Sequence, residues 1–329
     1  MHHEIQKRRL NIIGRDLENT KSFIEQGADI NTQTSLGDNA LFFSDSETTS
    51  YLIEKGIDIN HTNKQGETAI FHSEKEALKV LLNAGLDVNH TNNYKQNALF
   101  FVNDLESIDT LVKSGININQ IDSFGNNALM TLLPILEENE ERFNILDYYF
   151  EHGLDINQVN NEGYNLLFVG GYQYAKYFID NGIDINQIDN SGDSVLLFTL
   201  RKGFYVNNLK MVKLLVEHNI DINIPNDEDE IPLYYANTPE ICEVLIKAGA
   251  DISNKNILFK HVSNNNIRTV QFLLENGFDI NQTDYRGNKL LSKSKSFEMS
   301  VFLIDNGITY DEWDLKNCEQ DVLDYIKNK

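Results

Sequence analysis

The sequence predicts an all-α solenoid in which about nine to ten helix–turn–helix repeats stack side by side, joined by β-turn or hairpin tips. Two observations predict this fold. A five-residue segment of the form Gly-x-Asp-x-Asn returns along nearly the whole chain, and an apolar helical run precedes each copy. A regular period of this size is the signature of an array in which each unit buries its apolar face against its neighbours.

The recurring segment, called here the anchor, returns mostly every 28 to 30 residues, with two longer steps of 38 and 37 residues. Its copies begin at Gly27, Gly56, Gly85, Gly115, Gly153, Gly182, Asn219, Gly249 and Gly277, and a worn copy begins at Gly307. The anchor glycine fits a left-handed helix C-cap, and the asparagine that replaces it once is the next-best residue there. We expect the recurring Asp and Asn to hydrogen-bond the turn backbone.

Each repeat is predicted to hold an outer helix, a polar tip and a short first helix. The outer runs, such as 77–84 and 211–218, place apolar residues at three- and four-residue spacing. Tips such as 122–125 combine Asp or Asn with Gly, which favours a turn. Only residues 73–76 separate the apolar piece 68–72 from the next outer helix. The first helix should therefore have barely more than one or two turns.

At these residues the chain resembles the ankyrin repeat. That family reads Thr-Pro-Leu-His-x-Ala at the start of its first helix, and residues 231–233 and 68–70 match it best. The family's Gly-Ala-Asp-Val-Asn ending is matched best by residues 27–31 and 249–252. The family period is about 33 residues, so most repeats here are shortened. The resemblance implies an ankyrin solenoid whose tips and first helices line a concave groove that binds proteins.

The repeats predict one elongated domain over residues 1–329. Residues 1–26 form the N-terminal cap, with an outer helix at 19–26, residues 27–306 hold the repeats, and residues 307–329 form the C-terminal cap. Terminal repeats of such arrays need a polar outer face. Trp313 is expected to plug the last repeat.

The formal net charge is −22 and the isoelectric point is near 4.7. This charge argues against a binder of duplex nucleic acid or of anionic membranes. It favours either a basic protein partner or simply a solvated acidic surface. Cys242 lies in a helical run and is expected to be a buried thiol. Without a secretory or membrane-spanning segment, the protein is expected in the cytoplasm. A monomer is the expected oligomeric state.

Sequence motifs of catalysis are missing. The chain has no dinucleotide or phosphate-binding glycine loop, no His-x-x-x-His, no Gly-x-Ser-x-Gly and no twelve-residue calcium loop. His61 and His90 recur one residue after an anchor, which is typical of turn residues rather than of a catalytic pair. We therefore predict no enzyme, no cofactor and no metal.

The positions around the turn glycine vary most between repeats and are the candidate partner-binding residues. Large apolar residues stand there in five tips, at Leu36, Tyr94, Phe124, Tyr164 and Tyr285. Aromatic residues are typical interface anchors, whereas single exposed apolar residues are common, so the set matters only if it lines up on one side. Asp193 and Arg286 are further candidates. By contrast, four first-helix residues are expected in the core: Phe43, Phe101, Phe198 and Tyr235.

Two acidic stretches complete the candidate contacts. One is a tip of consecutive acids in which Asp229 replaces the turn glycine: Asp227, Glu228, Asp229 and Glu230. The other is the insertion in the first long repeat: Glu137, Glu138, Glu140 and Glu141. Insertions in solenoids often lie on the binding face; the alternative is a solvated turn between lengthened helices. The second long repeat has its extra residues near 203–208.

Ankyrin proteins of bacteria include immunity proteins, antitoxin-like inhibitors and counter-defence factors, and the Asn-, Ile- and Lys-rich usage is typical of an AT-rich bacterial or phage genome. The resemblance and the charge together favour a non-catalytic inhibitor that sequesters a basic, nucleic-acid-binding effector. The alternatives are a recruiting scaffold or secreted-effector adaptor, and a sensor of a small ligand or nucleotide.

Overall fold

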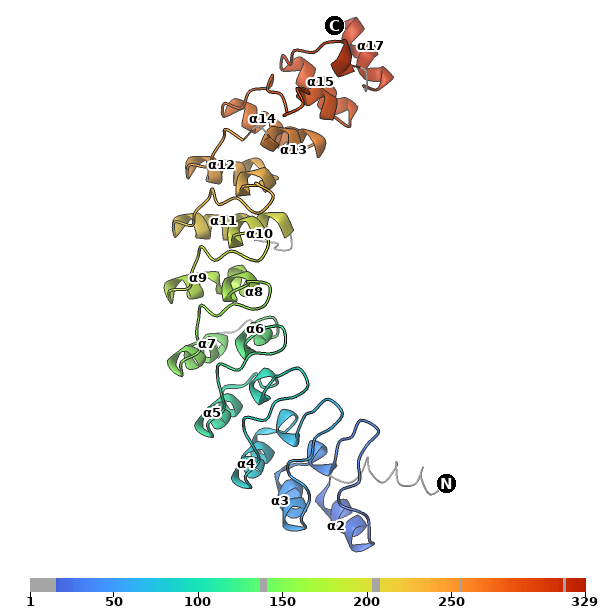
Figure 1. Ribbon diagram of the computed structural model, residues 1–329, viewed down its shortest axis with the longest axis vertical. Helices are drawn as coiled ribbons and strands as arrows, with labels where there is room; N and C mark the ends of the chain where they lie inside the picture. The colour runs from blue at the N-terminus through green and yellow to red at the C-terminus, as the bar shows by residue number, and fades with distance from the viewer. Residues whose placement is uncertain (1–15, 137–140, 203–207, 255, 316–317) are drawn as a thin grey trace. The chain divides into compact units, whose positions relative to one another are not determined.

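The computed structural model describes residues 16–136, 141–202, 208–254, 256–315 and 318–329 (Figure 1). The chain divides into two compact units, residues 1–161 and 162–329, which are described separately below. One continuous domain over residues 1–329 stays a prediction.

Unit 1 is a series of helix pairs, each with a short first helix and a longer outer helix. After the outer helix α2 (Leu17–Glu25), the pairs are η1 (Ala40–Phe43) with α3 (Ser46–Glu54), η2 (Ala69–Phe71) with α4 (Lys75–Asn83), η3 (Ala98–Phe100) with α5 (Leu105–Lys113), and α6 (Ala128–Leu132) with α7 (Glu141–Glu151). Neighbouring outer helices pack on each other, α2 on α3, α3 on α4, and α4 on α5.

Unit 2 repeats the same arrangement. Its pairs are α8 (Leu166–Gly170) with α9 (Tyr172–Asp180), α10 (Val195–Lys202) with α11 (Asn208–Glu217), η4 (Pro232–Tyr235) with α12 (Pro239–Lys247), α13 (Asn256–Ser263) with α14 (Ile267–Glu275), η5 (Leu290–Lys293) with α15 (Phe297–Asp305), and α16 (Glu312–Leu315) with α17 (Gln320–Asn328). The described residues contain isolated β-bridges in three tips but no extended strand. The all-α fold is confirmed.

In several short repeats the first helix is a single 3₁₀ turn, as in η1, η2 and η3, whereas α8 and α13 are short α-helices of 5 and 8 residues. In η2, the His72 N–H donates to the Ala69 carbonyl at 3.1 Å, and the chain enters α4 at Lys75. No residues are left to form i→i+4 bonds, so the helix ends after one turn. The first helix of the second long repeat, α10, is a true α-helix of 8 residues. The prediction of shortened first helices is therefore confirmed.

In several repeats one asparagine links the start of the first helix to the end of the repeat by hydrogen bonds. The Asn97 Oδ1 caps η3 by accepting from the Leu99 N–H at 3.1 Å, while its Nδ2 donates to the Asn117 carbonyl in the following anchor at 2.9 Å. Asn39 makes the same two bonds, to Leu41 and Asp58. One side chain thus starts the first helix and ties it to the end of its own repeat.

The anchor Asp and Asn have separate roles. Asp58 Oδ1 accepts from the N–H two residues later at 3.0 Å and so fixes its own turn. Asn223 reaches the next repeat, donating to the Gly249 carbonyl at 3.1 Å and accepting from the Asp251 N–H at 2.8 Å. The predicted bonds to turn backbone are confirmed, and the Asn additionally joins neighbouring anchors.

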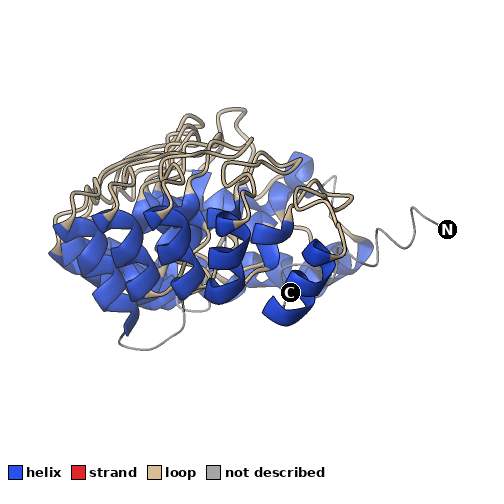
Figure 2. Ribbon diagram, turned by 90° about the horizontal axis from the view of Figure 1, so that it is seen from below, coloured by secondary structure: helices blue, strands red, loops and turns tan. Residues whose placement is uncertain are grey.

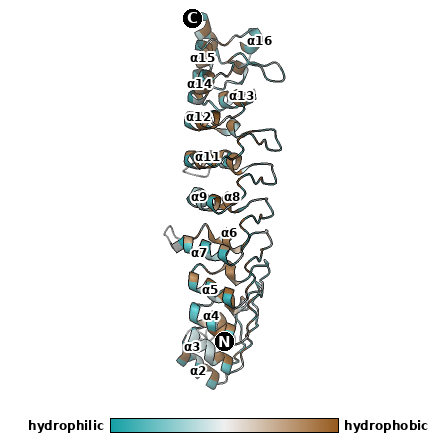
Figure 3. Cartoon of the chain, turned by 90° about the vertical axis from the view of Figure 1, so that its left-hand side faces the viewer, coloured by the Kyte–Doolittle hydropathy of each residue, from teal (hydrophilic) through white to brown (hydrophobic). Residues whose placement is uncertain are grey.

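Within each unit the outer helices contribute apolar residues to a core that neighbouring repeats share. Leu52, Leu81 and Leu111 stand at matching positions of three outer helices and are fully buried. Apolar colour lies mainly on the helices rather than on the tips (Figure 3). Burying each leucine stabilises the fold by roughly 1.5–3 kcal/mol. This core holds the tips and first helices, which carry the candidate surface.

Candidate protein-binding surface

The tips of consecutive repeats stack through their backbones, and in each unit the loops lie to one side of the helices (Figure 2). In unit 1 the Ser123 N–H donates to the Tyr94 carbonyl at 2.8 Å, and the Asn161 N–H donates to the Phe124 carbonyl at 2.9 Å. His90 braces the same stack, because its Nε2 lies 2.7 Å from the Gly66 carbonyl of the preceding tip. The two recurring histidines are turn residues, as predicted, and they also join neighbouring tips.

The residue before the turn glycine therefore uses its carbonyl within the stack and turns its side chain outward. In unit 1 this position holds Leu36, Gln65, Tyr94 and Phe124. The side chains of Leu36, Tyr94 and Phe124 are 55%, 53% and 58% exposed. These three residues share one position in tips of the same stack and form the tip row.

The other two apolar candidates stand differently in unit 2. Tyr164 follows its turn glycine and is half-buried, with its ring 5.1 Å from that of Phe168 and 5.2 Å from that of Phe198. Tyr285 stands two positions before its glycine and is 86% exposed, with the Arg286 guanidinium 5.1 Å from its ring. The structure thus brings together three of the five apolar residues predicted as partner contacts.

Asp193 lies inside the array rather than on its surface. The residue is 1% exposed, and its carboxylate accepts from the Asn226 Nδ2 of the next tip at 3.0 Å and pairs with Arg201 at 3.1 Å. The carboxylate of Asp193 is therefore used within the fold, by the neighbouring tip and by Arg201. We remove Asp193 from the candidate contacts for this reason.

The acidic tip presents three of its four carboxylates to solvent. Asp227, Glu228 and Asp229 are exposed, whereas Glu230 is half-buried and accepts from the Tyr235 hydroxyl at 2.7 Å. Burial, and then this bond to Glu230, raise the pKa of Tyr235 well above its usual value. Asp229 adopts a φ of 59° in the left-handed turn position, as its replacement of the glycine predicted.

The acidic insertion lies at the edge of the described structure. Glu137, Glu138 and Glu140 are outside the described residues, and Glu141 begins α7 with its side chain outside the described part. The Trp313 side chain and residues 203–207 of the second insertion also lie outside it.

Two expected core residues lie on the surface instead. Phe43 and Phe101 are 40% and 41% exposed, while Phe198 and Tyr235 are half-buried. The core prediction is wrong for Phe43 and Phe101, because a single 3₁₀ turn buries the preceding phenylalanine and leaves the next ring on the open side. His72 occupies the same position in the repeat between them and is exposed.

Phe43, His72 and Phe101 form the aromatic row of unit 1, on the face made by the first helices. The His72 ring centre lies 5.8 Å from that of the buried Phe42 and 6.3 Å from that of Phe101. Sequence reasoning missed this row, although its signal was the matching position of the three residues after each short apolar piece.

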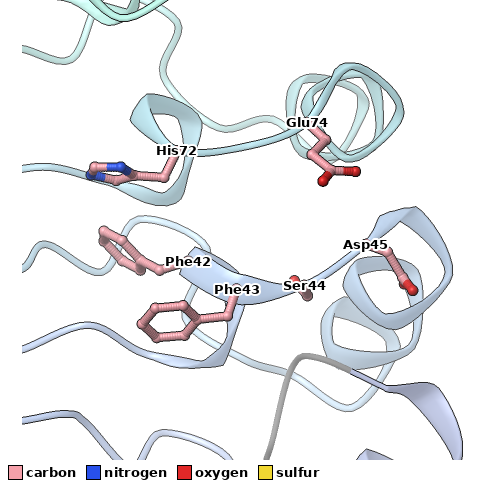
Figure 4. A pocket seen from close by; sticks show the side chains of 6 residues that line it. All are labelled: Phe42, Phe43, Ser44, Asp45, His72 and Glu74. Atoms are coloured by element: carbon pink, nitrogen blue, oxygen red, sulfur yellow. The ribbon is translucent and has the colours of Figure 1, made fainter. Parts of the chain in front are cut away.

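A hollow of about 450 Å³ opens between the first two of these repeats, lined by Phe42, Phe43, Ser44, Asp45, His72 and Glu74 (Figure 4). The three rings lie at one end of the view, and the carboxylates of Glu74 and Asp45 at the other. A second hollow of about 570 Å³ shares Asp45 and Glu74 and reaches Phe101 and Asp104. Both lie where the short first helices end.

Two strongly shifted pKa values belong to buried groups away from these hollows. Burial lowers the pKa of His261 to about 4, with the Leu233 carbonyl opposing the shift, and raises the pKa of Cys242 to about 12. Cys242 is fully buried, as predicted. Across the residues that the structure describes, no three His, Cys, Asp or Glu side chains gather as metal ligands. In the same residues no helix has the length and apolar character needed to cross a membrane.

Comparisons with known proteins agree with this architecture. Residues 168–256 match the family model "Ankyrin repeats (3 copies)". A solved structure, the ankyrin repeat domain of Bcl-3, described as a unique member of the IkappaB protein family, is similar in fold with a TM-score of 0.52. It is 19% identical, and the match covers 61% of this chain and 91% of that one. A search of curated proteins finds no match.

The repeat pattern, the stacked helix pairs and both of these matches lead to one assignment. Residues 168–256 carry ankyrin repeats, and the chain has the fold of an ankyrin-repeat solenoid.

Proposed function

We propose that this protein is a non-catalytic inhibitor that sequesters a basic protein through the tips and first-helix face of its repeats. Ankyrin repeats are typical of protein-binding modules, and their fold generally acts as a scaffold rather than as a catalyst. The proposed role is of the immunity, antitoxin or counter-defence type, and the proposed target is a basic effector such as a nucleic-acid-binding enzyme.

The observation that carries the proposal is a strongly negative net charge together with exposed acidic residues in both units and exposed aromatic rings. The net charge is −22. The anchor aspartates of both units are exposed, at Asp29, Asp58, Asp87, Asp155, Asp184, Asp221, Asp251 and Asp279. Charge of one sign steers an oppositely charged partner and raises its association rate. The tip row and the aromatic row supply the apolar contacts that hold an interface together.

An acidic surface also suits inhibition in particular. A protein that binds nucleic acid carries a basic face for the phosphates, and an acidic array that covers this face competes with the natural substrate. The proposed contacts are the tip row, Tyr164, Tyr285, Arg286, the acidic tip at 227–230 and the insertion glutamates at 137, 138, 140 and 141.

The test is affinity capture with the full chain at about 0.05 M and about 0.5 M salt, followed by mass spectrometry. The proposal expects captured proteins of high isoelectric point that are released at high salt, because screening weakens exposed charge pairs. The matched control replaces Asp227, Glu228 and Asp229 with Asn, Gln and Asn, and should capture less. Partners that are acidic or neutral and insensitive to salt would contradict the proposal.

A further inference from the structure

The hollow between η1 and η2 combines two chemistries that one kind of side chain satisfies. Its walls carry the rings of Phe42, Phe43 and His72 at one end and the carboxylates of Glu74 and Asp45 at the other (Figure 4). Arginine has an apolar stem, a planar guanidinium that stacks on aromatic rings, and donors that match a carboxylate. We propose that this hollow is a pocket for an arginine side chain from an extended, basic segment of the partner.

Glu74 is the residue that distinguishes this hollow from an ordinary helix start. The equivalent residues Asp45 and Asp104 cap α3 and α5 by accepting from the Thr48 N–H at 2.8 Å and the Ser107 N–H at 3.0 Å. Glu74 precedes α4 at the same position but makes no capping bond. Among the described residues its carboxylate has no hydrogen bond or ion pair, so it is free to receive a cation.

This arrangement is unfavourable for the fold taken alone. Loss of a helix cap costs typically about 1 kcal/mol, and an aspartate, as in the two neighbouring repeats, would supply it. The longer glutamate instead carries its charge into the hollow (Figure 4). A ligand with a positive head gives that charge a partner.

The surrounding charges favour a cation as the occupant. Lys75 lines the second hollow, but it pairs with Asp104 at 3.3 Å and with Glu106 at 3.5 Å. The His72 Nε2 lies 2.9 Å from the Glu67 carboxylate, which also offsets any positive charge on that ring. Glu74 and Asp45 border both hollows. Consecutive arginines of one segment could therefore use both.

The pocket exists because the first helices are short. η1 and η2 end at Phe43 and Phe71 after single 3₁₀ turns, and both hollows open beside the residues that follow. The shortened repeats thus explain both the exposure of the aromatic row and the position of the pocket. The inference rests on the proposed function, since it names the partner chemistry that unit 1 takes.

The test measures binding of a fluorescein-labelled octa-arginine peptide to the full chain by fluorescence anisotropy. Octa-lysine and octa-citrulline serve as comparison probes, because the first keeps the charge and the second keeps the shape. The key variant is Glu74→Gln, and Phe43→Ala tests the apolar wall. The control is Glu25→Gln, which removes the same charge from the exposed last residue of α2. Circular dichroism establishes that each variant is folded.

The pocket predicts that octa-arginine binds more tightly than octa-lysine and that octa-citrulline binds least. Glu74→Gln should raise the dissociation constant by about twofold to fivefold, as expected for an exposed ion pair, and Glu25→Gln by less than about twofold. Equal losses for Glu74→Gln and Glu25→Gln would overturn the pocket and would leave a basic partner bound elsewhere on the acidic surface. The proposed function is tested separately, by the capture experiment, and fails if that experiment yields no basic partner.

Discussion

The stacking of the tips can be tested by adding a single methyl group at Gly125. This glycine has a φ of 78°, and a Cβ there would lie 2.6 Å from the Asn161 Oδ1 and 2.8 Å from the Asn161 nitrogen. The Asn161 N–H donates to the Phe124 carbonyl at 2.9 Å, and this bond joins two consecutive tips. Gly125→Ala must therefore displace the next tip.

A matched control separates this contact from the cost of the backbone conformation. Gly153 has a φ of 89°, but a Cβ there would meet nothing within 4 Å. In both variants the left-handed conformation of the alanine lowers the free energy of unfolding by about 1–2 kcal/mol. Only Gly125→Ala also loses the tip bond, worth about 1 kcal/mol, and adds a steric clash. We expect losses of about 1–2 kcal/mol for Gly153→Ala and about 3 kcal/mol for Gly125→Ala.

The assay is urea unfolding followed by circular dichroism, with the transition of unit 1 compared between the two variants. Hydrogen exchange of the Asn161 amide adds a local measurement, since this amide should lose protection in Gly125→Ala and keep it in Gly153→Ala. Equal destabilisation of the two variants, with the Asn161 amide still protected, would refute the idea that the tips are held by close backbone contact.

Three further predictions concern single side chains. Asn223→Ala removes two bonds to the next anchor and should lower the free energy of unfolding by about 1–2 kcal/mol in urea titrations; no change would mean that anchor bonding is incidental. Asp229→Gly removes the strain of a non-glycine residue at a φ of 59° and should raise the free energy of unfolding by about 0.5–1 kcal/mol. The thermal midpoint should rise accordingly, and a lower midpoint would contradict this. Burial lowers the pKa of His261 from 6.5 to about 4 in the folded protein. As the pH falls, the unfolded chain therefore takes up this proton before the folded protein does. The free energy of unfolding should be highest above pH 6.5 and fall as the pH approaches 4, with a loss of about 2 kcal/mol at pH 5. His261→Gln should flatten that part of the stability profile, and an unchanged profile would contradict the assignment.

Much of the fold could be predicted from the sequence because residues within each repeat determine its local structure. The anchor glycines, the recurring Asp and Asn, and the short gap between residues 72 and 75 each correspond to a cap, a turn or a 3₁₀ helix in the structure. Local bonds of two to four residues determine these features, so one copy carries the information for all.

The candidate surface was less predictable because it depends on contacts between repeats. The difference between Phe42, which is buried, and Phe43, which is exposed, depends on the ending of η1 after one turn. Asp193 is buried because Asn226 and Arg201 reach it from other positions in the chain. In the sequence Glu74 is an acidic residue before a helix, like Asp45 and Asp104. Only the structure shows that it makes no capping hydrogen bond.

The central claim is that this acidic array acts by binding a basic protein. The most direct measurement is the dissociation constant of the full chain with its captured partner, determined by titration calorimetry between about 0.05 M and 0.5 M salt. The account predicts affinity that falls steadily as salt rises, together with no turnover of the partner. An affinity independent of salt, or chemical conversion of the bound partner, would contradict it.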